Sequence, residues 1–369
     1  MLMYPLPLAQ RLPPQVGTPS GPAMNGSPSV VTTLAPAPRK QLLSPDHPDI
    51  AMSLVNLASI QWMRANFSKV EANFGEALEL FKKRGNQAAV GVLQANLATV
   101  FLRRGNLAAA QEMHEKTLTL RQQLFKGDHP HVEISLTQLG LVLPTRGDLI
   151  GAEARLKEAL AMQERLGLGR HADVADAFAG FGTVLAKKGD WIAAQEKHQR
   201  ALDIRIEVLK GEDNPDVVDS LDALGVVAIA QGNLSEAQKI LLRALEGARK
   251  SESSDYPAVI PPLWHLGWVM KQNGDLAGSA ECQREAEALS LKHGVYGAWP
   301  LLRGMYDLAD VLLVQHKFTE VEPLLAEVAD YVQKNLSNNF TLQRDSFQRA
   351  AVWRGKIREV EQLVNSKPL

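Results

Sequence analysis

Apolar residues recur along this chain at the spacing of three and four positions that gathers them on one face of a helix. Two clear stripes are Leu136, Leu139, Gly140 and Leu143, and Leu221, Leu224, Gly225 and Ala228. A capping residue and a proline, which the first helical turn tolerates, precede each stripe, and a similar start occurs earlier. These starts are Asp46-His47-Pro48, Asp128-His129-Pro130 and Asp213-Asn214-Pro215. The pattern predicts a helix after each of them.

A second apolar stripe follows each first one, with Ala at two fixed positions. Examples are Leu149, Ala152, Leu156, Ala159 and Leu160, then Trp191, Ala194, His198, Ala201 and Leu202, then Leu234, Ala237, Leu241, Ala244 and Leu245. Small residues at fixed positions let two helices approach closely. Each unit is therefore predicted to be an antiparallel helical hairpin.

A glycine followed by Asn or Asp separates the two predicted helices and recurs every 42 or 43 residues. These hinges are Gly105-Asn106, Gly147-Asp148, Gly189-Asp190, Gly232-Asn233 and Gly274-Asp275. Glycine commonly ends a helix, and Asn or Asp commonly begins one. A fixed period of this length is typical of a solenoid, in which each unit buries its apolar face against its neighbours.

The Leu-Gly or Leu-Ala pair in the first helix, the early Ala of the second helix and the Ala seven residues later resemble the tetratricopeptide repeat over residues 46–333. The longer period, the Asp-His-Pro starts and the phrase from Ser135 to Gly140 resemble its kinesin-light-chain type. That type is also common in bacterial signalling proteins. The resemblance implies an all-α fold, a right-handed α-solenoid of tandem helical hairpins, with a ligand-binding groove lined by the first helices.

The ends of the chain depart from this period. Ten of the first 45 residues are proline, so residues 1–45 are predicted to be a disordered tail or linker. Residues 46–333 would form about seven repeats, and residues 334–369 would form degenerate capping helices. The hinges at Ala65-Asn66 and His316-Lys317 lack the glycine. Pro144 and Pro323 fall inside predicted helices and should each cause a local kink or a lost hydrogen bond.

Composition and motifs argue against several classes of protein. The formal net charge of the 369 residues is −1, which indicates neither nucleic acid nor an anionic membrane as partner. One cysteine, Cys282, precludes an internal disulfide, and no apolar run is long enough to span a bilayer. No catalytic or metal-binding motif is present. We therefore expect a cytoplasmic protein that is not an enzyme and has no cofactor or metal; the pattern leaves its oligomeric state open.

Three groups of residues are candidates for the groove. The resemblance implies that Asn56 and Asn96 bond an extended peptide backbone, and Gln138 could act likewise; the alternative is that these amides simply face water. The second group is acidic and consists of Asp176, Asp219 and Asp222. It predicts that the middle of the groove is acidic and suits a basic or hydroxyl-rich ligand; the alternative is a solvated run of charge.

The third group combines aromatic and charged residues and predicts a binding hot spot. It consists of Trp264, His265, Trp268, Arg303, Tyr306 and Asp310. Its alternative is packing against the C-terminal cap.

Two functions are consistent with these features. The first is a non-catalytic scaffold that binds a peptide or protein segment along the first helices. The second is a sensory or regulatory module that binds a signal ligand and controls a partner enzyme such as a kinase. The sequence does not identify the partner.

Overall fold

The computed structural model of the chain describes residues 44, 46–64, 66–169, 171–250, 257–293, 298–335, 348, 351–355 and 357–358. Within these ranges every regular element is a helix, and no strand occurs. The predicted tail, residues 1–45, lies outside the described residues except for Ser44, and so does Ala65 of the first hinge. Much of the predicted capping segment, residues 334–369, also lies outside them.

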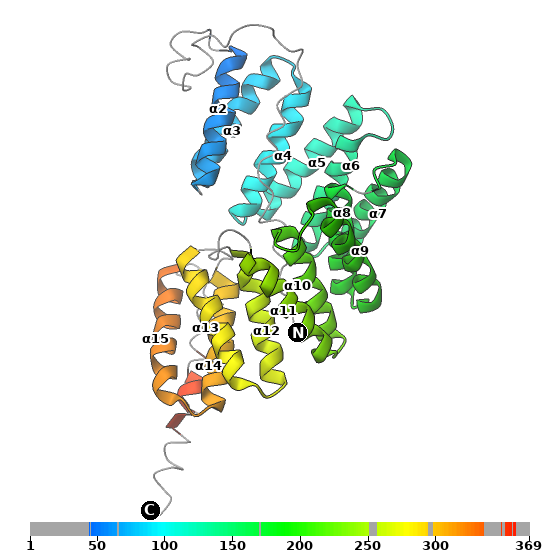
Figure 1. Cartoon of the computed structure of the whole chain (residues 1–369). Helices are drawn as coiled ribbons and strands as arrows, with labels where there is room; N and C mark the ends of the chain where they lie inside the picture. The colour runs from blue at the N-terminus through cyan, green and yellow to red at the C-terminus, as the bar shows by residue number, and fades with distance from the viewer. Residues whose placement is uncertain are drawn as a thin grey trace, which may run out of the picture. The chain divides into compact units, whose positions relative to one another are not determined.

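The helices follow one another as antiparallel pairs, which we call helix A and helix B of each repeat (Figure 1). The A helices are α2 (Pro48–Met63), α4 (Gln87–Arg103), α6 (Pro130–Val142), α8 (Ala172–Lys188), α10 (Pro215–Ala230), α12 (Ile260–Gln272) and α14 (Ala298–Val314). The B helices are α3 (Phe67–Lys83), α5 (Leu107–Leu124), α7 (Leu149–Leu166), α9 (Trp191–Leu209), α11 (Leu234–Lys250), α13 (Leu276–His293) and α15 (Phe318–Asn335). Two short 3-10 helices, η3 (Leu143–Arg146) and η4 (Pro257–Val259), precede α7 and α12.

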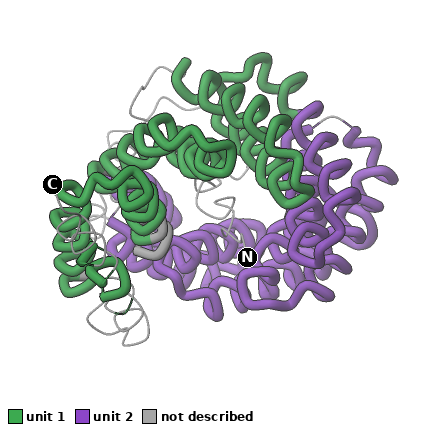
Figure 2. The backbone as a smooth tube through the Cα atoms, turned by 90° about the horizontal axis from the view of Figure 1, so that it is seen from below, with its two compact units in different colours: residues 1–4, 205–369 green, residues 5–204 purple. Residues whose placement is uncertain are grey.

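The chain divides into two compact units, residues 5–204 and residues 1–4 with 205–369 (Figure 2). In the first unit each helix from α2 to α7 packs against the next helix in sequence, and in the second unit each helix from α10 to α14 does the same. A helices of consecutive repeats also touch, as α6 does α8 and α10 does α12. Packing that is confined to neighbours defines a solenoid, so the prediction of an all-α solenoid is confirmed.

The Gly-Asn and Gly-Asp hinges work by local geometry. Gly147 and Gly189 have φ values of 85° and 86°, in the left-handed region that favours glycine. The residue after each glycine caps helix B. Asp148 Oδ1 accepts from the Gly151 N–H at 2.8 Å, and Asp190 Oδ1 accepts from the Ala193 N–H at 3.1 Å. The hinges at Gly105, Gly232 and Gly274 share the positive φ.

The proline-containing starts are also capped as predicted. His129 Nδ1 accepts from the His131 N–H at 3.1 Å, and Asn214 Oδ1 accepts from the Asp216 N–H at 2.9 Å. In both starts the capping side chain belongs to the residue directly before the proline. His47 caps α2 in the same way, with 3.2 Å between its Nδ1 and the Asp49 nitrogen.

Helix A and helix B approach closely where helix A carries a glycine. A Cβ atom added at Gly140 would lie 2.6 Å from Leu156 Cγ, and one added at Gly225 would lie 2.6 Å from Leu241 Cδ2. Leu156 and Leu241 are fully buried. The glycine therefore leaves the space that the leucine of helix B occupies, which explains the Leu-Gly pair of the sequence pattern.

Pro144 changes the helix in which it lies. Helix α6 ends at Val142, and the chain continues as the 3-10 helix η3, with Pro144 in its first turn. Proline lacks the N–H that an α-helix needs there, so the predicted local disturbance is confirmed. Pro323, in contrast, lies inside the continuous helix α15.

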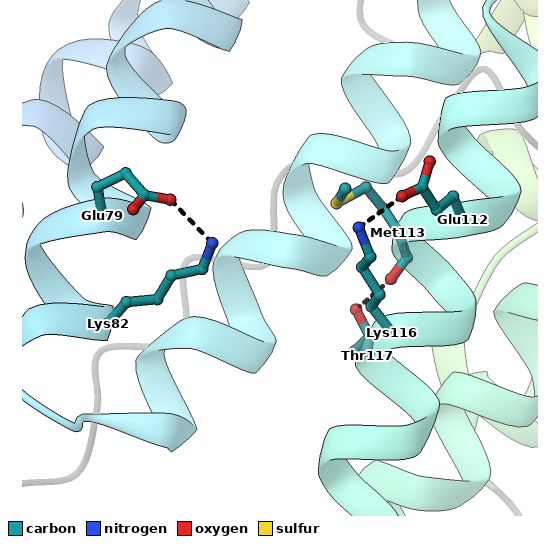
Figure 3. Close-up of polar contacts among 6 residues, drawn as sticks. All are labelled: Glu79, Lys82, Glu112, Met113, Lys116 and Thr117. Atoms are coloured by element: carbon teal, nitrogen blue, oxygen red, sulfur yellow. Dashed lines mark hydrogen bonds and ion pairs between the residues drawn. The ribbon is translucent and has the colours of Figure 1, made fainter.

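The exposed sides of the B helices carry ion pairs one turn apart (Figure 3). Lys82 Nζ lies 2.8 Å from Glu79 Oε1 on α3, and Lys116 Nζ lies 2.5 Å from Glu112 Oε1 on α5. Exposed pairs of this spacing contribute about 0.2–0.5 kcal/mol each. They make the outer side polar, and the burial of apolar side chains supplies most of the stability.

Candidate functional site

The candidate site is the A-helix face, by which we mean the positions on the A helices that the sequence predicts to bind a ligand. The A-helix face consists of Asn56, Asn96, Gln138, Asp176, Asp219, Asp222, Trp264, His265, Trp268, Arg303, Tyr306 and Asp310. All of these residues lie on A helices of the structure. The side chain of Arg303 lies outside those that the structure describes.

The amide side chains of the first three repeats occur at matching positions but in different surroundings. Asn56 on α2 is exposed, whereas Asn96 on α4 is only 3% exposed, and Gln138 on α6 is half-buried. Asn56 is therefore the amide most accessible to a ligand. The amide of Asn96 is enclosed in the packing around α4.

The acidic residues do not form a solvated run of charge. Asp176 on α8 is half-buried, while Asp219 and Asp222 on α10 are 9% and 2% exposed. A carboxylate that leaves water needs hydrogen bonds or a nearby positive charge. The surroundings of these carboxylates therefore determine what they can do.

Asp222 and His265 form a buried pair that joins two consecutive A helices. His265 Nδ1 on α12 lies 2.7 Å from Asp222 Oδ1 on α10, and the two side chains are 4% and 3% exposed. Because a carboxylate accepts hydrogen bonds, the Nδ1–H of the imidazole donates to it. Such a charge-assisted bond offsets part of the cost of burying the carboxylate. The sequence predicted both residues in the groove, and the structure brings them into direct contact.

The two tryptophans of α12 differ in exposure. Trp264 is 3% exposed, and a Cβ added at Gly304 of α14 would lie 2.6 Å from its Nε1, so its indole ring lies against α14. Trp268, one turn later, is half-buried. Trp268 is thus the indole of this pair that a ligand can reach without displacing a neighbouring helix.

Tyr306 and Asp310 on α14 contact the C-terminal segment. Tyr306 is 2% exposed and its ring lies 5.4 Å from that of Trp353, measured between centroids. Trp353 Nε1 donates to Asp310 Oδ1 at 2.9 Å, and Lys271 Nζ lies 3.7 Å from Asp310 Oδ2. These two residues of the face therefore also hold residues 351–355 against α14.

Sequence reasoning missed a buried acid in the first unit. Glu133 on α6 is 0% exposed. It accepts hydrogen bonds from Thr137 Oγ1 at 2.8 Å and from Gln163 Nε2 at 2.6 Å. Burial is the main cause that raises its pKa to about 7, and the nearby charges of Asp173 and Asp176 raise it further. The available signal was an acid at a helix-A position where the next repeats carry Ala175 and Val218.

Two observations on the described residues concern metal binding and thiol reactivity. Among them, no cluster of three or more His, Cys, Asp or Glu residues is arranged to hold a metal ion. Burial raises the pKa of the Cys282 thiol to about 11, so at neutral pH the thiol is not the reactive thiolate. What the face can do is present hydrogen-bonding and aromatic groups in fixed positions.

Comparison with known families decides what kind of repeat this is. Residues 90–165 and 173–250 match the family model described as tetratricopeptide repeat. Residues 90–165 and 173–250 therefore form tetratricopeptide repeats. The matched segments run from α4 through α7 and from α8 through α11. The predicted resemblance to the tetratricopeptide repeat is confirmed for these segments, and the kinesin-light-chain type stays a prediction.

Solved structures share the fold of this chain at low sequence identity. BtubC (BKLC) from P. vanneervenii is 20% identical with a TM-score of 0.53, covering 63% of this chain and 94% of its own. A Rap protein complexed with competence and sporulation factor is 13% identical with a TM-score of 0.54, covering 86% and 91%. A signal-transduction ATPase with a tetratricopeptide repeat sensor, from Pyrococcus horikoshii, is 15% identical with a TM-score of 0.58, covering 89% and 48%. At these sequence identities, the structural similarity shows a shared fold.

Two further observations concern curated sequences and membrane-spanning helices. A search of curated protein sequences found no match. Among the described helices, none combines the length and the apolar character needed to cross a membrane.

Proposed function

We propose that this protein is a non-catalytic scaffold that binds a peptide or protein segment along the A-helix face of α10, α12 and α14. The buried Asp222–His265 pair carries the proposal. Stacking of helices needs only apolar contacts at such positions, yet here a carboxylate and an imidazole lie 2.7 Å apart on consecutive A helices. Groups held this rigidly are preorganised, which lowers the entropic cost of binding.

Trp268 and the acidic residues of this face indicate the chemistry of the ligand. Trp268 is half-buried, so part of its indole can cover an apolar or aromatic side chain. The carboxylates of Asp219 and Asp222 add negative charge to the same face, which favours a ligand with basic or hydroxyl groups. The proposed ligand is therefore a segment that combines an apolar anchor with Lys, Arg, Ser or Thr residues.

The proposal is tested by selection from a displayed library of random peptides on the immobilised full-length chain. Selected peptides are then titrated by fluorescence anisotropy against wild type, Trp268→Ala and Asp222→Asn. We expect both substitutions to weaken binding about tenfold or more, as for residues at the centre of an interface. Glu246→Gln on α11 is the matched control. Glu246 forms an exposed ion pair with Lys250 at 2.8 Å and should not affect binding.

Two outcomes contradict the proposal. One is that the library yields no specific binder. The other is that the selected peptides bind all three variants and wild type equally. Circular dichroism of each variant shows whether the helices are intact, so a loss of binding is not confused with a loss of fold.

A sensory or regulatory module is a second candidate. It is supported by the fold shared with a Rap protein that was solved complexed with a factor, and with a repeat region described as a sensor. In that case a ligand would protect many amides from hydrogen exchange, including helices far from its own contacts. A scaffold would show protection only at the A-helix face of α10, α12 and α14. For both functions we propose a cytoplasmic location.

A further inference from the structure

Glu133 occupies a core position of its repeat. The corresponding positions of the next repeats are Ala175 and Val218, which are buried and apolar. Glu133 is equally buried, with 0% of its surface exposed. An acid at such a position is costly unless all of its oxygen atoms are satisfied.

Only one of the two carboxyl oxygens is satisfied by donors. Glu133 Oε1 accepts from Thr137 Oγ1 at 2.8 Å and from Gln163 Nε2 at 2.6 Å. Glu133 Oε2 is fully buried and has no hydrogen-bond partner among the described residues, and the same is true of Gln163 Oε1. The two acceptors without donors thus belong to one hydrogen-bonded acid–amide pair.

The orientation of the Gln163 amide is determined by its contacts. Its nitrogen donates to Glu133 Oε1 and also lies 3.4 Å from the carbonyl oxygen of Asp173, at the start of α8. If the amide were turned over, its oxygen would face two acceptors. The amide oxygen of Gln163 therefore points away from these two acceptors, to the side where no donor reaches it.

A single proton satisfies both orphaned oxygens. A protonated carboxyl group can donate its O–H to an amide carbonyl while its other oxygen accepts the amide N–H, which closes a ring of two hydrogen bonds. A proton on Oε2 would give Glu133 the donor that such a ring requires, directed to Gln163 Oε1. A proton on Oε1 would leave both Oε2 and Gln163 Oε1 without a hydrogen-bond partner.

The charges around Glu133 disfavour its ionised form. Burial is the largest cause that raises the pKa of Glu133, and the charges of Asp173 and Asp176 on α8 add to it, while the hydrogen bonds from Thr137 and Gln163 lower the pKa without cancelling the rise. Arg121 on α5 donates instead to the His131 carbonyl and to Ser135 Oγ. On α7, Arg165 is paired with Asp128, and on α6 itself His131 is exposed. Burial and the two aspartates together raise the pKa of Glu133 from 4.5 to about 7.

We propose that Glu133 is a proton-controlled latch in the joint between the third and fourth repeats. When protonated, it is bonded in a ring to Gln163, whose amide also reaches the first turn of α8, so α6, α7 and α8 are tied together. When ionised, it leaves Gln163 Oε1 without a donor and adds a negative charge beside Asp173 and Asp176. The ring of hydrogen bonds between Glu133 and Gln163 is then lost, and the contact of α7 with α8 becomes weaker.

The sign of the pH dependence follows from the raised pKa. Both the folded and the unfolded chain hold the proton below pH 4.5, so the stabilisation by the latch is then complete. As the pH rises from 4.5 to about 7, the unfolded chain releases its proton first, and the folded state loses stability relative to it. Above about pH 7 the folded chain ionises too and the loss levels off.

Carbon-13 NMR of the glutamate carboxyl groups in the full-length chain tests the protonation state. We expect one signal that titrates near neutral pH and is missing in Glu133→Gln. Asp176→Asn should lower the midpoint of that signal because it removes a negative charge. Thr137→Val should raise the midpoint because it removes a donor to the carboxylate. A Glu133 signal with an ordinary midpoint near 4.5, or one that neither variant shifts, overturns the proposal.

Urea unfolding across the same pH range tests the latch itself. The unfolding midpoint of Glu133→Gln, whose amide can form the same ring at every pH, should lose the fall that wild type shows as the pH rises to neutral. Glu79→Gln on the exposed side of α3 is the control and should retain that fall. Equal pH dependence in wild type and Glu133→Gln contradicts the latch. If Glu133→Gln does not fold, the shifts in Asp176→Asn and Thr137→Val decide.

Discussion

The indole of Trp353 donates a hydrogen bond to the carboxylate of Asp310, with 2.9 Å between Nε1 and Oδ1. Trp353 is 3% exposed and also packs against Tyr306. Asp310 and Tyr306 are residues that the sequence predicts to bind a ligand. Because both residues contact Trp353, the C-terminal segment and any ligand of α14 would contact the same helix.

The first prediction concerns this contact. Trp353→Phe keeps an aromatic ring but removes the N–H donor, and should lower the free energy of unfolding by about 0.5–1.5 kcal/mol. Trp353→Ala also empties a buried site and should cost about 3–5 kcal/mol. Thermal unfolding followed by circular dichroism measures both. Equal, small losses for the two variants would show that the segment contributes little to the stability of the last repeat.

The second prediction concerns the close approach of helix A and helix B. Gly140→Ala places a Cβ 2.6 Å from Leu156 Cγ and should destabilise the chain by about 1–3 kcal/mol through overpacking. Gly75→Ala on α3 is the matched control because no atom lies within 4 Å of its added Cβ. It should stabilise the chain by about 0.5–1 kcal/mol, since alanine is the better helix former. Urea unfolding of the two variants should therefore shift in opposite directions.

The third prediction concerns the seventh hinge, where His316 stands in place of glycine with a φ of 57°. A residue with a side chain is strained in this left-handed conformation by about 1–2 kcal/mol. His316→Gly should relieve most of the strain, with part of the gain offset by the greater freedom of glycine in the unfolded chain. We expect a rise in thermal stability, whereas Gly274→Ala, at a φ of 85°, should lower it. A fall for both variants would contradict this account of the hinge.

The fourth prediction concerns acid pH. His114 on α5 is 2% exposed, and burial, aided by the charge of Arg121, lowers its pKa from 6.5 to about 4. The folded chain thus binds this proton less readily than the unfolded chain. Its contribution to stability is complete above pH 6.5 and is lost as the pH falls towards 4. His114→Gln, which does not titrate, should show a smaller loss of thermal stability over that range than wild type.

Much of the fold could be predicted from the sequence because its signals are local. The positive φ of Gly147 and the cap formed by Asp148 depend on residues within one turn of each other. The same holds for the cap that His129 provides before Pro130. Repetition of these signals at a constant period indicated a solenoid, since each unit can pack only against the next.

The candidate site could be predicted only in part. The sequence placed Asp222 and His265 on A helices, but not their contact, which depends on how α10 and α12 pack. It likewise placed Trp264 and Trp268 on one face, yet Gly304 of α14 leaves room for the first indole, and only the second remains half-buried. Whether these residues bind a ligand stays a prediction.

The sequence by itself determined the helices, their hinges and caps, and the period that groups them into repeats, because these depend on backbone conformation within a few residues. Tertiary structure alone decided which polar groups are buried and what they contact. Asn56 is exposed and Asn96 enclosed at matching positions, and Glu133 meets Gln163 from the following helix. Burial and pKa depend on the neighbours that packing brings within a few ångströms, and a helical pattern does not specify those neighbours.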